Sequence, residues 1–348
     1  MLPLEVLEQV RAELQDWRGS GMSVMEVSHR SEAFVALAEE VQALLRELLR
    51  IPGHYEVLLL QGGATAQFAG VPLNLAPAAA TADYLDTGVW SRKAIEEAQR
   101  YCRVHVAVDE AASGYTTVPQ PSAIALTPGA AYVHYTPNET IGGVEFPYVP
   151  DTGTVPLVAD MSSTFLSRPI DVERFGLIYA GAQKNVGPAG LCIVIVRGNL
   201  VGRARPDTPT VLDYRAMARE GSMPNTPPTF AWYVAGLVLR WVKARGGLEA
   251  MAERNRAKAE LLYRAIDASG FYRNDVDGRC RSWMNVPFGL ANPALEDAFL
   301  REAQAAGLAN LGGHRSVGGL RASLYNAMPI EGVRALVEFM SDFERRHG

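Results

Sequence analysis

Residues 176–196 read Gly-Leu-Ile-Tyr-Ala-Gly-Ala-Gln-Lys184-Asn-Val-Gly-Pro-Ala-Gly-Leu-Cys-Ile-Val-Ile-Val. Two apolar runs of strand length flank a loop of small residues that carries Lys184. A strongly hydrated amine between two buried strands is costly unless it has a partner or a covalent role. The small neighbours leave room for a ligand to lie against the backbone. We therefore predict that Lys184 is suited to Schiff-base chemistry.

The scarcity of lysine makes this position more informative. The chain has four lysines among its 33 basic residues. The other three, Lys93, Lys243 and Lys258, lie in polar, periodic stretches, which predict positions on helix surfaces. Lys184 is therefore the candidate for a catalytic amine.

Composition excludes several classes of protein. The chain has 348 residues and 48% hydrophobic residues, enough for a large core and about two domains. A net charge of −5 without a long basic run gives no support for nucleic-acid or membrane-surface binding. No apolar run reaches transmembrane length, and the first residues lack the pattern of a signal peptide. Cys102, Cys192 and Cys280 are scattered without zinc spacing, which fits a metal-free protein with reduced thiols in the cytoplasm.

Predicted strands and helices alternate along most of the chain. We expect strands at residues 55–60, 84–86, 103–108, 131–135, 157–160, 175–180 and 191–196, and helices at 4–14, 31–49, 64–74, 91–101 and 229–243. This alternation predicts an α/β fold with a mostly parallel, helix-covered sheet.

The last hundred residues have a different pattern. Helices are expected at 248–269, 294–306 and 331–346, with strands at 282–288 and 320–325, which together indicate a smaller α+β domain. We therefore expect a large domain of residues 5–245 and a small C-terminal domain of residues 246–348, with residues 1–4 packing against the small domain.

A glycine pair, Gly62-Gly63, lies between a predicted strand and a predicted helix. Main-chain N–H groups left free at such a helix start form a good phosphate cradle. The spacing matches neither a nucleoside-triphosphate loop nor a dinucleotide-binding loop. An ordinary tight turn is the alternative interpretation.

Two further side chains could contact a planar ligand. Asp160 ends a predicted buried strand, where open α/β sheets bind ligands, and its carboxylate could hold a protonated ring nitrogen. It could equally cap the following Ser162-Ser163-Thr164 turn. Trp90 lies at the start of a helix and could stack on a ring, or could simply pack in the core.

A set of cations completes the candidates. His29-Arg30, His314-Arg315 and Arg321 lie beside small residues, and arginine binds doubly charged anions in a bidentate manner. Each could also be an ordinary surface residue. Together with the lysine, the acid, the aromatic ring and the glycine turn, they suggest a pyridoxal-phosphate site.

The chain resembles the phosphoserine aminotransferases, class V members of the fold type I superfamily of pyridoxal-phosphate-dependent enzymes. The resemblance extends over nearly the whole chain. It rests on these motifs: Val27-Ser-His-Arg, Pro137-Asn-Glu-Thr-Ile141, Asp160-Met-Ser-Ser-Thr, Ser167-Arg-Pro-Ile-Asp-Val172, Tyr179-Ala-Gly-Ala-Gln-Lys-Asn185, Asn225-Thr-Pro-Pro-Thr-Phe230, Gly313-His-Arg and Gly318-Gly-Leu-Arg-Ala-Ser-Leu-Tyr-Asn-Ala-Met-Pro329.

The resemblance implies a role for each candidate. Lys184 would bind the cofactor covalently and act as general base, Asp160 would pair with the pyridine nitrogen, and Trp90 would stack on the ring. Thr140 would bond near the ring hydroxyl. The phosphate would be held by Ala64, Thr65 and Gln183, and by Asn225 and Thr226 of the partner subunit. The substrate's carboxylate and phosphate would be bound by His29, Arg30, His314, Arg315 and Arg321, some of them across a dimer interface.

The implied activity is the transfer of an amino group between L-glutamate and 3-phosphohydroxypyruvate, which gives O-phospho-L-serine and 2-oxoglutarate in serine biosynthesis. Use of 4-phosphohydroxy-L-threonine, from vitamin B6 synthesis, stays open. We expect a cytoplasmic homodimer with shared active sites. Two alternatives also stay open: another class V enzyme, such as a serine–glyoxylate aminotransferase, and a non-catalytic fold type I scaffold.

The sequence departs from the family pattern in two places. Members usually carry Asn-Phe-x-x-Gly-Pro-Ala before a Leu-Pro pair, whereas this sequence reads Met1-Leu2-Pro3 there. Some members also have an arginine where Thr65 stands, which would leave more of the substrate-phosphate binding to His29-Arg30 and His314-Arg315.

Overall fold

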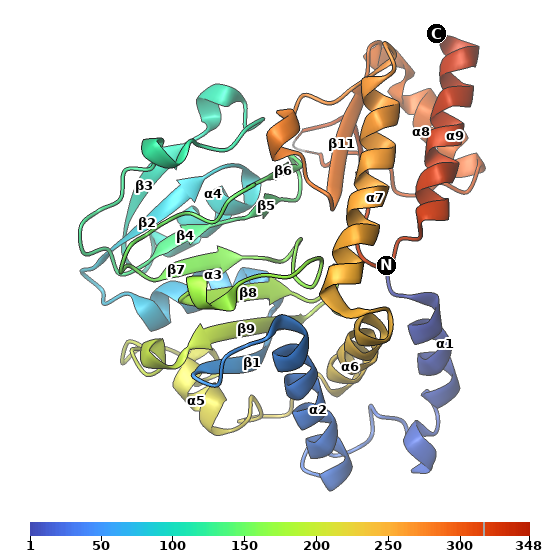
Figure 1. The fold of residues 1–348 in the computed structure, drawn as a ribbon. Coiled ribbons are helices and arrows are strands. Elements are labelled where there is room, and N and C mark those ends of the chain that lie inside the picture. The colour runs from blue at the N-terminus through green and yellow to red at the C-terminus, as the bar shows by residue number, and fades with distance from the viewer. Residues whose placement is uncertain (316) are drawn as a thin grey trace.

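The computed structural model describes residues 1–315 and 317–348. In Figure 1 the large sheet lies to the left, and α7 (Gly247–Asp267), α8 (Glu296–Ala305) and α9 (Ile330–His347) lie to the right in a smaller part of the molecule. The expected order of elements is thus confirmed in outline.

The large sheet has seven strands. Five neighbouring strands are parallel, while β9 is antiparallel to both of its neighbours, β8 and β1. The spatial order is β1 (Tyr55–Gln61), β9 (Leu191–Arg197), β8 (Leu177–Gly181), β7 (Leu157–Asp160), β4 (Val133–Tyr135), β2 (Thr81–Asp86) and β3 (Arg103–Asp109). The prediction of a mostly parallel sheet is therefore confirmed.

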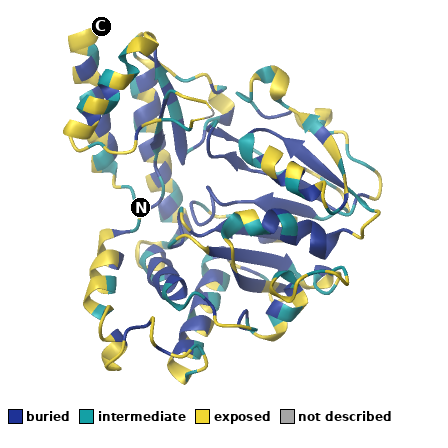
Figure 2. Ribbon diagram, turned by 180° about the vertical axis from the view of Figure 1, so that it is seen from behind, coloured by how far each residue is buried: buried dark blue, intermediate teal, exposed yellow. Residues whose placement is uncertain are grey.

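Helices cover both faces of this sheet. On β1, Val57 and Leu59 belong to one core cluster with α2 (Glu32–Leu49) and α6 (Thr229–Ala244). The alternate residues Leu58 and Leu60 belong to another cluster with α3 (Gly63–Leu75), α4 (Val89–Ala98) and α5 (Tyr214–Arg219). Figure 2 shows the buried strands between helices whose outer surfaces are exposed. This double cover explains the continuous apolar runs at β8 and β9.

The C-terminal part has its own sheet and core. The strands β10 (Tyr272–Arg273), β11 (Asn285–Leu290) and β12 (Leu320–Ser323) pair antiparallel. A third core cluster lies entirely within residues 259–343. We propose that the domains divide at residues 245/246, where Gly246 and Gly247 have φ of +94° and +72° at the start of α7.

The N-terminal segment leads into α1 (Leu4–Glu13), which packs against α6. Met1, Leu2 and Pro3 line a cavity of about 740 Å³ together with residues 326–331 of the small domain. This shared cavity supports our proposal that residues 1–4 pack with the small domain.

The periodicity did not predict every element. It missed α5, β10 and a two-strand hairpin of β5 (Asn138–Glu139) and β6 (Val144–Glu145). The three strands are only two residues long, too short to show a period. The hairpin is nevertheless important, because it lies beside the site described below.

The prediction for Lys258 was wrong. Its side chain is buried on α7, where Nζ donates to the main-chain oxygens of Leu324 at 2.9 Å and Tyr325 at 2.8 Å. Lys93 is exposed, and Lys243 pairs with Glu47 at 2.7 Å on the surface, as predicted.

Candidate active site

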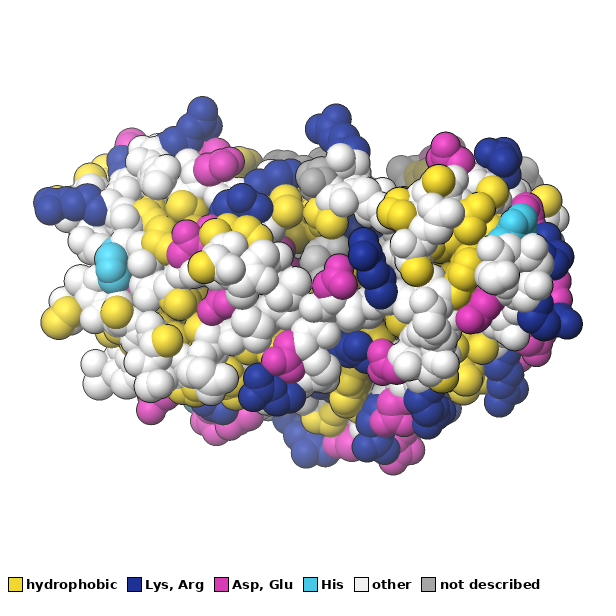
Figure 3. Space-filling view, turned by 90° about the horizontal axis from the view of Figure 1, so that it is seen from above, with side chains coloured by type: hydrophobic (Ala, Val, Ile, Leu, Met, Phe, Trp, Pro, Cys, Tyr) yellow, Lys and Arg dark blue, Asp and Glu magenta, His cyan; other side chains and the backbone are white. Residues whose placement is uncertain are grey.

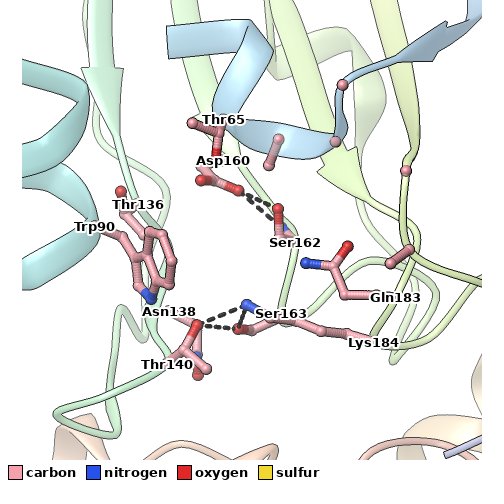
Figure 4. A pocket seen from close by; sticks show the side chains of 15 residues that line it. Thr65, Trp90, Thr136, Asn138, Thr140, Asp160, Ser162, Ser163, Gln183 and Lys184 are labelled. Atoms are coloured by element: carbon pink, nitrogen blue, oxygen red, sulfur yellow. Dashed lines mark hydrogen bonds between the residues drawn. The ribbon is translucent and has the colours of Figure 1, made fainter. Parts of the chain in front are cut away.

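A cavity of about 270 Å³ opens at the carboxyl ends of the parallel strands. Its wall comes from five segments that follow β1, β2, β4, β7 and β8, and Figure 4 shows their side chains around one open space. The lining residues are Gly62, Gly63, Ala64, Thr65, Trp90, Thr136, Asn138, Thr140, Asp160, Ser162, Ser163, Gln183, Lys184, Ala189 and Gly190. Residues far apart in sequence meet here because parallel strands end at the same sheet edge.

Lys184 lies in the short connection between the antiparallel strands β8 and β9. Its Nζ donates to Thr140 Oγ1 at 2.7 Å and to Ser163 Oγ at 2.9 Å. Burial lowers the pKa of the amine to about 8, although the negative charges of Asp160 and Glu139 oppose this shift. A substantial fraction of the amine is therefore neutral slightly above pH 7, which a nucleophile or base requires.

Asp160 ends β7 and lies across the open space from the Lys184 amine (Figure 4). Its Oδ1 accepts from Ser162 N at 3.0 Å and from Ser162 Oγ at 2.6 Å. The alternative role as a turn cap is therefore also real. Burial raises the pKa of this carboxyl group, and the Ser162 bonds and the Lys184 charge counteract the shift. A ligand that brought a positive charge would stabilise the carboxylate further.

Trp90 forms one side of the cavity (Figure 4). It is the second residue of α4, one residue before the start that the periodicity predicted. The Lys184 Nζ lies 5.9 Å from the centre of the indole ring, and the exposed Lys93 Nζ lies 4.7 Å from it. Trp90 also packs against a core cluster, so the packing and stacking interpretations are compatible.

Two hydroxyl groups hold the amine in place. Thr140 Oγ1 and Ser163 Oγ are 2.8 Å apart, and each accepts from Lys184. Thr140 was predicted as a cofactor residue, whereas Ser163 was considered only as part of a turn. The hydrogen bonds among these two hydroxyls and the amine fix the direction of the Lys184 side chain.

The glycine turn differs from the prediction in one respect. The N–H groups of Gly62 and Gly63 are engaged, because both donate to Gly190 O, at 3.1 and 3.4 Å. Ala64 and Thr65 are the second and third residues of α3, where N–H groups have no acceptor within the helix. They, and not the two glycines, are therefore the candidate phosphate donors. Gly62 has φ of +93°, and a Cβ there would lie 2.6 Å from Ala66 Cβ, so the turn requires glycine.

Gln183 faces the same end of the cavity as this helix start (Figure 4). A Cβ on Gly181 would lie 2.8 Å from Gln183 Oε1 and 3.4 Å from Ala64 N. Gly181 thus allows the lysine loop to approach the start of α3 closely.

The predicted cations are distributed unevenly. Arg321 on β12 lies next to the cavity: its Nη1 donates to Thr140 O at 3.5 Å, and its charge helps to lower the pKa of Lys184. The described lining residues do not include the two His-Arg pairs. Arg30 and Arg315 are exposed, and His29 and His314 are half-buried.

Asn225 and Thr226 also lie outside the lining of the described cavity and are exposed. Gln61 Nε2 donates to Thr226 O at 3.4 Å, which places the loop near the end of β1. Their predicted contact with a cofactor phosphate would therefore need a second copy of the chain.

Sequence reasoning missed several lining residues. Thr136, Asn138, Ser162, Ser163, Ala189 and Gly190 were not predicted as site residues. Asn138, Ser162 and Ser163 lie within motifs that were already notable, two or three residues from Thr140 or Asp160. Their position beside a strand end was the available signal.

Other kinds of site have little support in the described part of the chain. No group of three or more His, Cys, Asp or Glu side chains is arranged to hold a metal ion among residues 1–315 and 317–348. Within the same ranges, none of the helices combines the length and apolar character needed to cross a bilayer. Figure 3 shows charges of both signs interspersed on the face viewed from above.

Comparison with known proteins agrees with this geometry. The family model "Aminotransferase class-V" matches residues 1–336. The chain is 58% identical over 347 residues to a phosphoserine aminotransferase of Pseudomonas aeruginosa, covering 100% of this chain and 96% of that protein. It is 59% identical over 346 residues to a phosphoserine aminotransferase of Hahella chejuensis, covering 99% and 96%.

Solved structures are similar over the same length. The phosphoserine aminotransferase of Bacillus circulans subsp. alkalophilus matches with a TM-score of 0.98 and 50% identity, covering 100% of this chain and 97% of that one. The fold type I architecture that the resemblance implied is therefore confirmed. On the family model, the sequence identity and the fold, the chain belongs to the class V aminotransferase family.

Proposed function

We propose that this chain is a pyridoxal-phosphate-dependent phosphoserine aminotransferase, which exchanges an amino group between L-glutamate and 3-phosphohydroxypyruvate. The observation that carries the proposal is the Lys184 amine, with its lowered pKa, facing a buried Asp160 across a cavity walled by Trp90. Relatives that are 57–59% identical over the whole chain carry this name, which favours the proposal over a serine–glyoxylate aminotransferase.

The residues present fit the cofactor. Asp160 is a buried carboxylate whose Oδ1 accepts from Ser162 N and Oγ, and its negative charge suits a protonated ring nitrogen. Trp90 offers an aromatic face, and Ala64, Thr65 and Gln183 border the end where α3 begins. The cavity volume is near the lower end of the range for ligand pockets, roughly 300–1,000 Å³. A solved relative of Trichomonas vaginalis, 41% identical with a TM-score of 0.93 over 98% of this chain, is described as PLP bound.

The cofactor, when bound, supplies an electron sink for the amino-group transfer. Lys184 would hold it covalently, and its free amine would remove the proton from the substrate Cα as general base. Thr140 and Ser163 keep the Lys184 amine directed into the cavity. The negative charge of Asp160 would keep a ring nitrogen of the cofactor protonated.

Substrate binding requires positive charge at the mouth of the cavity. Arg321 lies closest, and we assign the substrate carboxylate or phosphate to it together with His29, Arg30, His314 and Arg315. Arginine supports this role because it binds both groups in a bidentate manner. The extra charge favours phosphorylated substrates over simple amino acids.

The enzyme is proposed to be a homodimer with composite active sites. This proposal is supported by Asn225, Thr226 and Arg30, which are exposed and lie outside the lining of their own cavity. A two-fold interface would place the same loops in both sites. We also propose a cytoplasmic location, supported by three buried, unpaired cysteines.

Arg315→Ala tests the substrate assignment. We expect KM for O-phosphoserine to rise at least about tenfold, since a charge-assisted bond of roughly 1.5–3 kcal/mol is lost. The cofactor spectrum should not change. The control is Arg334→Ala, which removes an exposed arginine paired with Glu331 on α9 and should leave KM unchanged.

A paired assay separates the alternatives. Glutamate alone should change the absorbance of the bound cofactor, and 3-phosphohydroxypyruvate should restore it. A protein that binds the cofactor without this change is a non-catalytic scaffold. If serine reacts as well as O-phosphoserine in the native enzyme, another class V activity is the better assignment.

A further inference from the structure

Glu139 is a buried carboxylate beside the cavity with an unusual pair of partners. It lies on β5, and its side chain is almost completely buried at 1% exposure. Its Oε2 accepts from Trp90 N at 3.0 Å, and its Oε1 accepts from Ser91 N at 2.8 Å. One side chain from a distant strand therefore binds two of the unpaired N–H groups at the start of α4.

Local residues do not provide this cap. The residue before α4 is Gly88, which has no side chain, whereas a Ser or Asp there would ordinarily cap the helix. A Cβ at Gly88 would lie 2.7–2.9 Å from atoms of the Glu139 side chain. Gly88 thus leaves space for the carboxylate of Glu139. A purely structural cap would not need a buried charge, which is costly.

The neighbours of Glu139 connect it to the reactive amine. Thr140, the next residue, accepts from Lys184 Nζ at 2.7 Å. Asn138, the preceding residue, donates to Asn285 of β11 at 3.0 Å. The β5 segment therefore joins the Trp90 backbone, the Lys184 amine and the small domain through three consecutive residues.

Glu139 also contributes charge. The charged groups that act on Lys184 are Asp160 on β7, Glu139 on β5 and Arg321 on β12. The two carboxylates favour the protonated amine, and Arg321 disfavours it.

We propose that Glu139 is a positioning residue, which fixes the Trp90 indole and the Thr140 hydroxyl relative to Lys184 and tunes the charge of that amine. The role in catalysis rests on the proposed transamination. The positioning role can be measured without substrate.

Two substitutions separate geometry from charge. Glu139→Asp keeps the negative charge but is one methylene too short to reach both N–H groups. Glu139→Gln keeps the length but loses the charge, and its amide nitrogen cannot accept the second N–H. The matched control is Glu145→Gln, which changes another buried carboxylate of the same hairpin, one that pairs with Arg168 and accepts from Trp283 N at 3.0 Å.

The four lysines allow a direct measurement in the apoprotein. With ¹³Cε-labelled lysine, NMR titration should give four signals, of which that of Lys184 is assigned through Lys184→Ala. We expect Glu139→Gln to lower the pKa of Lys184 by about one unit, and Glu139→Asp to leave it nearly unchanged. Hydrogen exchange at Trp90 and Ser91 should become at least about tenfold faster in both variants. In the holoenzyme, both should lower kcat about tenfold or more with little change in KM.

Specific outcomes would overturn the proposal. If both Glu139 variants match Glu145→Gln in lysine titration, exchange and kcat, Glu139 is only a structural carboxylate. If the apoprotein measurements change as expected but the wild type does not transaminate, the proposed function fails while the positioning geometry stands. If wild type is active and the variants keep its kcat, the proposed function stands and the positioning role fails.

Discussion

Two lysines of this protein, the half-buried Lys184 and the buried Lys258, have similarly lowered pKa values in different surroundings. Lys184 donates to two side-chain hydroxyls and interacts with the charges of Asp160 and Glu139, and its pKa is about 8. Lys258 donates to two main-chain carbonyls, and burial alone lowers its pKa to about 7. A lowered pKa therefore does not by itself identify a catalytic amine. The hydrogen-bond partners distinguish the two amines. Two side-chain hydroxyls beside an open cavity leave the Lys184 amine accessible to a ligand, whereas two main-chain carbonyls hold the Lys258 amine in a structural contact.

The largest effect expected from this contrast is the loss of activity in Lys184→Ala. Without the amine there is neither covalent attachment nor a base at the substrate Cα, so the rate should fall by at least about 10³–10⁴-fold. The rate of amino transfer from glutamate is the measurement. Lys258→Ala is the control, and it should retain the chemical step in whatever fraction of the protein remains folded.

Borohydride trapping tests the same contrast without turnover. Reduction of the native holoenzyme should fix the cofactor to Lys184, and mass spectrometry of peptides should locate the label. A label on Lys258 would break the comparison, since it would show that a buried amine bonded to carbonyls is also reactive.

Asp160→Asn should have the next largest effect. The amide cannot keep a ring nitrogen protonated, so kcat should fall roughly 10²–10³-fold while some cofactor still binds. Because Asp160 is the largest influence that raises the pKa of Lys184, the same variant should lower that pKa in the apoprotein and leave Lys258 unchanged. If kcat of Asp160→Asn stayed within a few-fold of the wild-type value, the role of Asp160 would be limited to capping the turn at Ser162.

The smallest effect concerns stability and its dependence on pH. Lys258 has a pKa of about 7 in the folded protein, below its ordinary value of 10.5. Between these values the unfolded chain binds more protons, so the free energy of unfolding should rise with pH, by up to about 1.4 kcal/mol per unit. Below pH 7 both states are protonated and the cost of burying the charge is constant.

Lys258→Met should remove that rise. Urea unfolding of the apoprotein at pH 6.5, 8 and 9.5 should show that the free energy of unfolding of wild type increases relative to that of the variant as the pH rises. The control is Lys243→Met, which replaces an exposed lysine paired with Glu47. The free energy of unfolding of this control should depend on pH in the same way as that of wild type. Parallel curves for Lys258→Met would mean that this amine titrates normally.

Much of the fold follows from the sequence because apolar periodicity reports burial over long elements. The runs at β8 and β9 and the stripe of α2 were located to within a few residues. The periodicity failed at β5 and β6, where two residues per strand carry no period and the pairing is set by tertiary contacts.

Lys258 shows a different failure. Met251, Asn255, Lys258, Leu262 and Ile266 form one buried stripe of α7 at helical spacing. Lys258 was assigned to the surface by its type, although its spacing matched the apolar residues. Asn255 is buried too, and its Nδ2 donates to Ser167 O at 3.0 Å. Position in the stripe was the better indicator, because a polar group can be buried when carbonyls accept its protons.

Residue type and a place after a predicted strand were enough to predict that Lys184 and Asp160 lie in one cavity, whereas Thr140 was named through the family resemblance alone. The site was not predictable where a residue acts only through shape or through another side chain. The contact of Ser163 with the amine, and the reach of Glu139 across to α4, depend on which loops the sheet order brings together. Spacing along the chain does not contain that information.

The reversed direction of β9 has a practical consequence. Because β8 turns back at once into β9, the lysine loop joins the ends of β1, β2, β4 and β7 at one edge of the sheet. The candidate cofactor residues that line the cavity therefore lie at that edge, and the connections that lead into the parallel strands lie at the opposite edge. The connection before β2, with exposed Ala78 and Ala79, is such a place. Added residues, a purification tag or a fluorescent reporter inserted there would leave the catalytic edge intact, which makes this end of the molecule its natural point of attachment.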